Sequence, residues 1–165
     1  MDAPQIKIYQ PSEPRPSYNA IVALGTTASI GLGVPTFLAS ASLGTVAVGT
    51  DGQGTTSQNF TGISKSVSTE VTATAGSVTL WLPLPGMIYM ATAKTASDFN
   101  TAATVNAHVG RRVVFDLTAT GGVWTIDTAA SDSATNAIVI IGGDPLTSEV
   151  HFVYKATCSV LGQIA

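Results

Sequence analysis

Residues 110–127 read GRRVVFDLTATGGVWTID, two β-prone runs separated by a turn signal that contains Gly121-Gly122. This pattern is typical of a β-hairpin. If the loop has two residues, odd positions of the first strand share a face with even positions of the second, because side chains alternate along a strand. One face is then apolar and carries Val113, Phe115, Leu117, Trp124 and Ile126. The opposite face is predicted to meet water or a partner. It carries Arg112, Asp116, Thr118, Thr125 and Asp127.

The position of the turn decides which residues of this hairpin lie opposite each other. With Gly121-Gly122 at its centre, Asp116 lies opposite Asp127, and like charges in that position destabilise the ladder unless a cation or Arg112 intervenes. A turn centred on Thr120-Gly121 removes the clash and keeps both faces unchanged. We therefore favour the shifted register.

Charged residues are scarce in this chain of 165 residues, which has the length of one domain. Only 10% of the residues are charged, 45% are hydrophobic, and the mean hydropathy is +0.34. Typical soluble domains have about 25% charged residues, so this surface would be poorly solvated in a free monomer. Burial between chains in an oligomer or assembly would resolve the shortage. The net charge of -3 argues against nucleic-acid binding, which needs clustered Lys and Arg.

The cysteine content, the N-terminus and the apolar segments indicate whether the chain is secreted or inserted in a membrane. Cys158 is the single cysteine, which excludes an intrachain disulfide and a cysteine zinc site, and we expect it to be a small buried side chain in a late strand. The N-terminus, MDAPQIKIYQ, lacks the pattern of a secretory signal. Residues 20–48 are uncharged and long enough to span a bilayer, but several glycines, Pro35 and many Ser and Thr interrupt them. Short buried strands are the preferred prediction, and no membrane partner is expected.

Composition divides the chain into three predicted segments. Residues 1–18 form an extended Pro-rich arm, because Pro4, Pro11, Pro14 and Pro16 disfavour a helix. Residues 19–61 form an apolar, Gly/Thr-rich β segment that we expect to make an interface. Residues 62–165 form a C-terminal β domain.

A short alternating run lies within the arm. Ile6 and Ile8 share one face, and Lys7 and Tyr9 share the other, so residues 5–9 are predicted to form a short strand that pairs with the edge of a sheet. Such an arm can add itself to the sheet edge of another chain. A disordered tail is the alternative.

Further strands follow from alternation or from continuous apolar runs bounded by turn residues. Beyond the hairpin they are expected at 67–74, 78–84, 87–91, 137–141, 149–155 and 157–164. Pro83 and Pro85 should stop the second of these or place it at an edge. Because residues 137–141 show no alternation, both faces of that strand are predicted to be covered.

One helix is predicted, at about residues 97–109. Ser97 can cap its N-terminus, Asp98 complements the helix dipole, and Gly110 can end it in the left-handed conformation. Four of its side chains are expected to face the sheet: Phe99, Ala102, Ala103 and Val109. His108 lies near the helix end and needs no catalytic role there.

The sequence contains no recognisable catalytic motif. HExxH, GxSxG, the P-loop and a GxGxxG after a strand are all missing, and His108 and His151 are too few for the common histidine-rich metal centres. Asp116 and Asp127 resemble paired catalytic carboxylates, but solvated strand residues explain them better. We predict that the chain is not an enzyme and that it has no metal or cofactor.

Three aromatic residues raise the question of carbohydrate binding. Trp81, Tyr89 and Trp124 would form a sugar-binding platform if they were exposed together. Positions in the core or in a subunit interface are the preferred interpretation.

The hairpin VGRRVVFDLTATGGVWTID, the polar loop after it, the run IVIIGGDP and the strand EVHFVYKA together resemble the C-terminal β domain of head decoration, or cement, proteins of tailed bacteriophages. The Pro-rich arm and the composition rich in Ala, Thr, Ser and Gly are similar to that class too. The similarity covers about the last seventy residues. It is a similarity of pattern and includes no diagnostic motif.

This resemblance implies a small, mainly β protein, either a β-barrel or a β-sandwich, that is often a homotrimer. It implies a location on the outer surface of the virion, where the protein would bridge subunits of the major capsid protein. Ile6, Ile8 and Tyr9 are then the predicted contacts with the capsid or an adjacent subunit. The alternative function is a carbohydrate- or receptor-binding β module of a phage fibre or tail tip.

Overall fold

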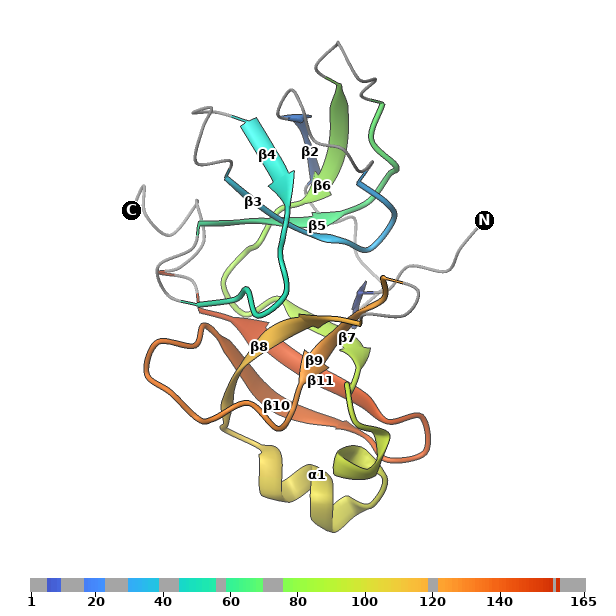
Figure 1. Ribbon diagram of the computed structural model, residues 1–165, viewed down its shortest axis with the longest axis vertical. Helices are drawn as coiled ribbons and strands as arrows, with labels where there is room; N and C mark the ends of the chain where they lie inside the picture. Colours follow the sequence, from blue (N-terminus) through green and yellow to red (C-terminus); the bar gives the residue numbers. More distant parts are fainter. Residues whose placement is uncertain are drawn as a thin grey trace.

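The computed structural model describes residues 6–9, 17–22, 30–38, 45–55, 59–69, 76–118, 122–155 and 157. It shows a closed five-stranded β-barrel above a six-stranded antiparallel sheet, with one short α-helix below the sheet (Figure 1). The predicted fold class, mainly β with one short helix, is confirmed. Of the two architectures predicted, the barrel is the one observed in the N-terminal half.

The barrel is built from the strands β2 (Ser17–Val22), β3 (Pro35–Leu38), β4 (Thr45–Val48), β5 (Phe60–Ser64) and β6 (Ser77–Trp81). Their order around the barrel is β2-β4-β3-β5-β6, and antiparallel pairing of β2 with β6 closes it. Gly62 in β5 has a φ of 143°, and a Cβ at this position would collide with the backbone oxygen of Trp81. Only glycine therefore allows β5 and β6 to approach this closely. β6 ends before Pro83, as predicted.

The lower sheet contains β1 (Lys7–Ile8), β7 (Ile88–Thr92), β8 (Arg112–Leu117), β9 (Trp124–Asp127), β10 (Ile138–Asp144) and β11 (Glu149–Tyr154). Their order is β1-β7-β11-β10-β8-β9. The chain after β7 returns to the far edge, where Ala93 forms a bridge with Ile126 and the N–H of Lys94 donates to the carbonyl oxygen of Ile126. The sheet therefore curls around its buried side chains.

The hairpin of β8 and β9 adopts the shifted register. Phe115 lies opposite Ile126, and Asp116 lies opposite Thr125, so the two aspartates are not directly paired. The prediction of this register is confirmed, although the turn at 119–121 lies outside the described residues. The apolar face is also confirmed, since Phe115 and Ile126 are fully buried.

Aromatic side chains join the two halves into one core. The ring of Phe60 in the barrel stacks on Tyr154 of β11 with centroids 4.3 Å apart, and Phe37 of β3 lies edge-on to Phe115. The loop after β4 adds backbone contacts. The N–H of Gly52 donates to the Phe115 carbonyl, the N–H of Phe115 donates to the Gln53 carbonyl, and the N–H of Ala137 donates to the Gly54 carbonyl. This loop from the barrel therefore inserts between β8 and the start of β10.

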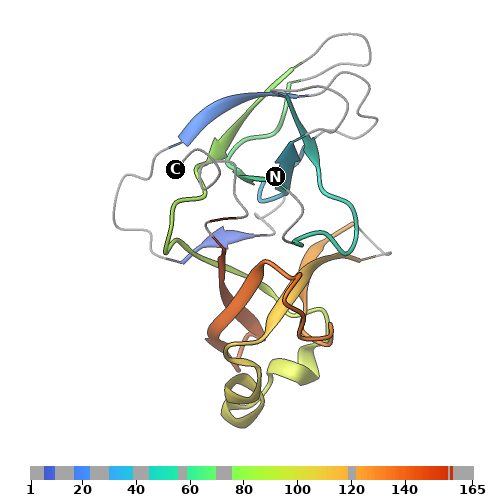
Figure 2. The ribbon, with the colours of Figure 1, turned by 90° about the vertical axis from the view of Figure 1, so that its left-hand side faces the viewer.

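β1 connects the N-terminal residues to both halves. It is an edge strand paired with β7, whereas the N–H of Ile6 donates to the carbonyl of Gly33, which precedes β3 of the barrel. Figure 2 shows β1 at the level where barrel and sheet meet. The boundary predicted at residue 62 falls inside β5. The chain passes from the barrel to the sheet later, between β6 and β7.

The helix is shorter than predicted and has a different cap. A 3-10 turn, η1 (Ala96–Phe99), precedes α1 (Ala102–His108), and Thr101 caps α1 in a reciprocal capping box with Thr104. The prediction of Ser97 as the cap is therefore wrong. Gly110 does adopt a left-handed φ of 85° after the helix, as predicted. Facing the core are Phe99 and Val105, whereas Ala102, Ala103 and Val109 are exposed.

The structure departs from two of the strand predictions and describes little of a third. Residues 67–69 form no strand and Val67 is exposed, while residues 70–74 lie outside the described ranges. β10 alternates between buried and partly exposed side chains, so the prediction that both its faces are covered is wrong. Of the expected last strand, only Thr157 is described, and Cys158 lies outside the described residues.

Candidate interaction surface

The predicted contact residues of the arm lie on opposite sides of the sheet. Ile6 is 2% exposed and belongs to the core, and Ile8 packs against that core. Tyr9 points the other way, is 44% exposed, and has its ring centroid 4.3 Å from that of His151. Alternation along the strand is confirmed, and it leaves only Tyr9 of these three well exposed to another molecule.

Beyond Tyr9, the side of the sheet that faces away from the core carries several apolar side chains, with charged residues such as Lys7 and Arg112 on the flanking strands. Strand register places Ile88 opposite Val153 and Val153 opposite Val139, across β7, β11 and β10. In the next row Met90 lies opposite His151. All of these side chains are partly exposed, whereas their neighbours along each strand, such as Tyr89 and Phe152, are buried. We call this surface the outer face and define it by Tyr9, Ile88, Met90, Val139, Ile141, His151 and Val153.

A bulge in β10 makes the outer face uneven. The register with β11 shifts between Ile140 and Gly142, and Ile141 at the bulge is 40% exposed. Gly142 lies opposite His151, and no atom beyond its chain neighbours lies within 4 Å of the position a Cβ would take. The outer face thus has projecting side chains at Tyr9 and Ile141 and an open position at Gly142.

Charges at the margins of the outer face are paired with one another. Lys7 lies 3.8 Å from Glu149, and the Nε of Arg112 lies 2.9 Å from the Oδ1 of Asp132. Each pair joins a cation to an anion of the same chain. The margins therefore add little net charge to the apolar surface between them.

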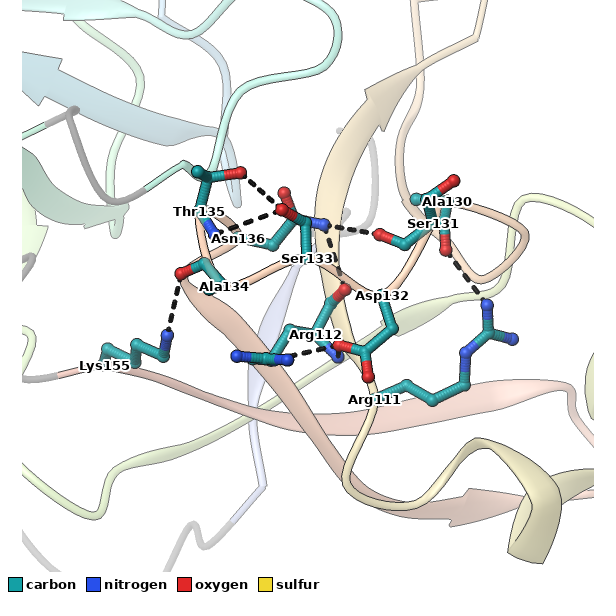
Figure 3. A network of polar contacts seen from close by, with 10 residues as sticks. All are labelled: Arg111, Arg112, Ala130, Ser131, Asp132, Ser133, Ala134, Thr135, Asn136 and Lys155. Atoms are coloured by element: carbon teal, nitrogen blue, oxygen red, sulfur yellow. Dashed lines mark hydrogen bonds and ion pairs between the residues drawn. The ribbon is translucent and has the colours of Figure 1, made fainter.

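The pair at Arg112 belongs to a network that holds the loop after β9 (Figure 3). Arg112 donates to Asp132 through both its Nε and its backbone N–H, and this lowers the pKa of Asp132 below its usual value. The side-chain amide of Asn136 donates to the Arg112 carbonyl, and Arg111 and Lys155 each donate to a backbone carbonyl of the loop. The adjacent arginines thus fasten this loop to β8.

A second polar cluster lies farther along the β8–β9 hairpin. The Nζ of Lys94 lies 2.7 Å from Asp116 Oδ1 and 3.4 Å from Asp127 Oδ2, and the hydroxyl of Thr125 donates to Asp116. The hydrogen bond to Asp116, with a smaller contribution from Asp127, raises the pKa of Lys94. Asp116 and Thr125 are each only 5% exposed, so the prediction that this face meets water is wrong for them. The cation between the aspartates is Lys94 and not Arg112.

Lys94 could not be assigned to this cluster from its position in the sequence. It follows β7, and it reaches the hairpin only because the chain after β7 pairs with β9. The one available signal was the like-charge pair itself, which calls for a cation from elsewhere in the chain.

The remaining candidates have roles in packing. Tyr89 and Trp124 are 1% and 2% exposed, and Trp81 lies under the ammonium of Lys65 at 4.4 Å, so these three aromatics do not form a shared exposed platform. The ring of His108 bonds to the carbonyl of Thr104 near the end of α1.

Within the described ranges, no group of three or more His, Cys, Asp or Glu side chains is placed to hold a metal ion. The same residues include no helix long and apolar enough to cross a membrane. Comparison with protein-family models, with curated proteins and with solved structures finds no match for this chain.

Proposed function

We propose that the chain is a non-enzymatic structural protein that binds the outer surface of a viral capsid and stabilises it by bridging subunits of the major capsid protein. The proposal starts from the resemblance to phage head decoration proteins, and with it come a location on the virion and self-association. The structural observation that supports it most is that the described charged side chains are paired within the chain.

Every Lys, Arg, Asp and Glu in the described part of the chain has a partner within the chain. Besides the two clusters, these contacts join Asp51 to the Leu117 N–H, Asp98 to the hydroxyl of Thr128, and Asp144 to the Leu146 N–H. Enzymes instead position charged groups to act on a substrate. Charges that fasten loops, together with an apolar outer face, suit a rigid protein that works by binding other proteins.

The test uses capsids of the virus that encodes this chain, assembled from the major capsid protein alone. The purified chain should sediment with them, saturate at a fixed number of copies per capsid subunit, and raise the temperature at which the capsids disassemble. Light scattering during heating measures that temperature. A lack of saturable binding would refute the proposal, as would binding without stabilisation.

Removal of residues 1–16 is a poor version of this test. The deletion takes away Ile6, which is buried in the core, and with it the whole of β1. A loss of binding would then report damage to the fold. Intact chain is therefore the reagent, and a glycan array serves as the counter-test: binding there without capsid binding would favour a receptor-binding module.

A further inference from the structure

We propose that copies of this chain exchange β1, so that residues 6–9 of one copy fill the site beside β7 of another. We call residues 6–9 the arm strand. The exchange takes place in the free protein and needs no capsid. It joins identical subunits through contacts that a single chain already makes.

The arm strand fits its site on both sides. Toward the core, Ile6 is 2% exposed and Ile8 packs against the buried cluster. On the outer side, the ammonium of Lys7 and the ring of Tyr9 both contact side chains of β11. Four consecutive side chains therefore specify this strand.

Backbone bonds hold the arm strand as well. It pairs with β7, where the N–H of Tyr9 donates to the carbonyl of Ile88. The N–H of Ile6 donates to the carbonyl of Gly33. Without the arm strand, the edge of β7 and the core around Ile6 would be open to water, so a strand has to fill the site. All these partners lie at Gly33 or beyond it in the chain, and none of the contacts depends on which copy supplies the strand.

The sequence that follows the arm strand favours supply from another copy. Residues 10–16 read QPSEPRP and lie outside the described residues. Each proline fixes its own φ and restricts the residue before it to extended backbone, so Ser12 alone among these residues escapes both restrictions. This sequence predicts a semi-rigid spacer. Because such a spacer folds back less readily than a flexible one, it lowers the effective concentration of the arm strand at its own site.

Exchange of the arm strand predicts closed rings. An arm strand that leaves its own copy empties a site there, and an open chain of copies always keeps one empty site. Only a ring of two or three copies fills every site, because each copy then gives one arm strand and receives one. Such rings should come apart slowly on dilution, since Ile6 must first leave the core.

Disulfide trapping between full-length chains tests the exchange. Lys7 and Met90 are direct partners across β1 and β7, at a separation that a disulfide can bridge. In a Cys158→Ser background, Lys7→Cys protein is mixed with Met90→Cys protein at about 0.5 mM, which approaches the effective concentration of a tethered strand. We expect a covalent heterodimer in a glutathione buffer, because this bond can form only between copies.

The matched control replaces the acceptor position. Ile21 lies on β2 of the barrel and is 55% exposed, so Ile21→Cys offers a more accessible thiol that does not pair with the arm strand. Its mixture with Lys7→Cys should give about tenfold less heterodimer, because only random collision brings these thiols together. Equal yields from the two mixtures, or no heterodimer from either, would refute the exchange.

The double variant Lys7→Cys/Met90→Cys reports the number of copies. Chains that keep their own arm strand give an oxidised monomer, whereas exchanged chains give a covalent ring whose mass is measured after denaturation. Alanine at Pro11, Pro14 and Pro16 should shift the product from ring to monomer. Monomer as the sole product of the double variant, or a ladder of open chains, would overturn the proposal. Capsids take no part in these assays, so a failure of capsid binding would leave their result unchanged.

Discussion

Asp116 is the one buried charged residue among those described, and its removal should cost more than the loss of an exposed charge. Asp116→Ala removes the nearer of the two carboxylates that contact the Lys94 ammonium, and it removes the side-chain acceptor of the Thr125 hydroxyl. Because Thr125 is also buried, we expect the free energy of unfolding to fall by about 1–3 kcal/mol in urea denaturation. Asp132→Ala is the control, since its pair with Arg112 is exposed and should contribute little. Equal effects of the two variants would contradict the importance of burial.

The pKa of Lys94 sets a pH window for the same cluster. Hydrogen bonding to Asp116 raises the pKa of Lys94 above 10.5, so the folded chain holds this proton more tightly than the unfolded chain does. The stabilisation is therefore complete below pH 10.5 and is lost as the pH rises through the folded-state pKa. The difference in unfolding free energy between wild type and Lys94→Met should be constant near neutral pH and shrink above 10.5.

Urea titrations of both proteins at a series of pH values measure this difference. Both proteins keep every tyrosine, so the ionisation of tyrosines at alkaline pH largely cancels in the comparison. A difference that stays constant through the alkaline range would show that the Lys94 ammonium is not what stabilises the hairpin.

The short helix α1 depends on its cap more than on its own length. Seven residues are too few for a stable isolated helix, so the capping box of Thr101 and Thr104 and the packing of Val105 must hold it. Thr101→Ala removes the side chain that accepts from the N–H of Thr104 and should lower stability by about 1 kcal/mol. Ser97→Ala, at an exposed position outside α1, should have no measurable effect. Chemical denaturation compares the two, and the reverse order would restore Ser97 as the cap.

The barrel and the sheet should unfold together, because one aromatic cluster spans both. The chain has two tryptophans, Trp81 in β6 of the barrel and Trp124 in β9 of the sheet. In the variants Trp81→Phe and Trp124→Phe, the remaining tryptophan reports on one half. Coincident urea transitions are expected in fluorescence. A barrel transition well separated from that of the sheet would mean that the contacts of Phe60 with Phe115 and Tyr154 do not couple the halves.

Local sequence patterns were sufficient for the features that depend on neighbouring residues. Alternation predicts the buried faces of β8, β9 and β11, because side chains alternate in any strand. Avoidance of the Asp116–Asp127 clash predicts the register, and Gly110 marks the end of the helix because glycine adopts a positive φ at little cost. The helix cap was missed because Thr101 and Ser97 are both acceptable caps, and packing of Phe99 in the core places the 3-10 turn before the helix.

The sequence by itself determined a mainly β chain, the hairpin with its register, the inward side chains of the strands, and a surface short of charge. Only the tertiary structure decided that β1 lies on the chain's own sheet, that Lys94 neutralises Asp116, and that an apolar face spans four strands. The physical reason is distance along the chain. Strand alternation is a local property, whereas β1 meets β7, and Lys94 meets Asp116, only after closure of long loops whose partners no local pattern specifies.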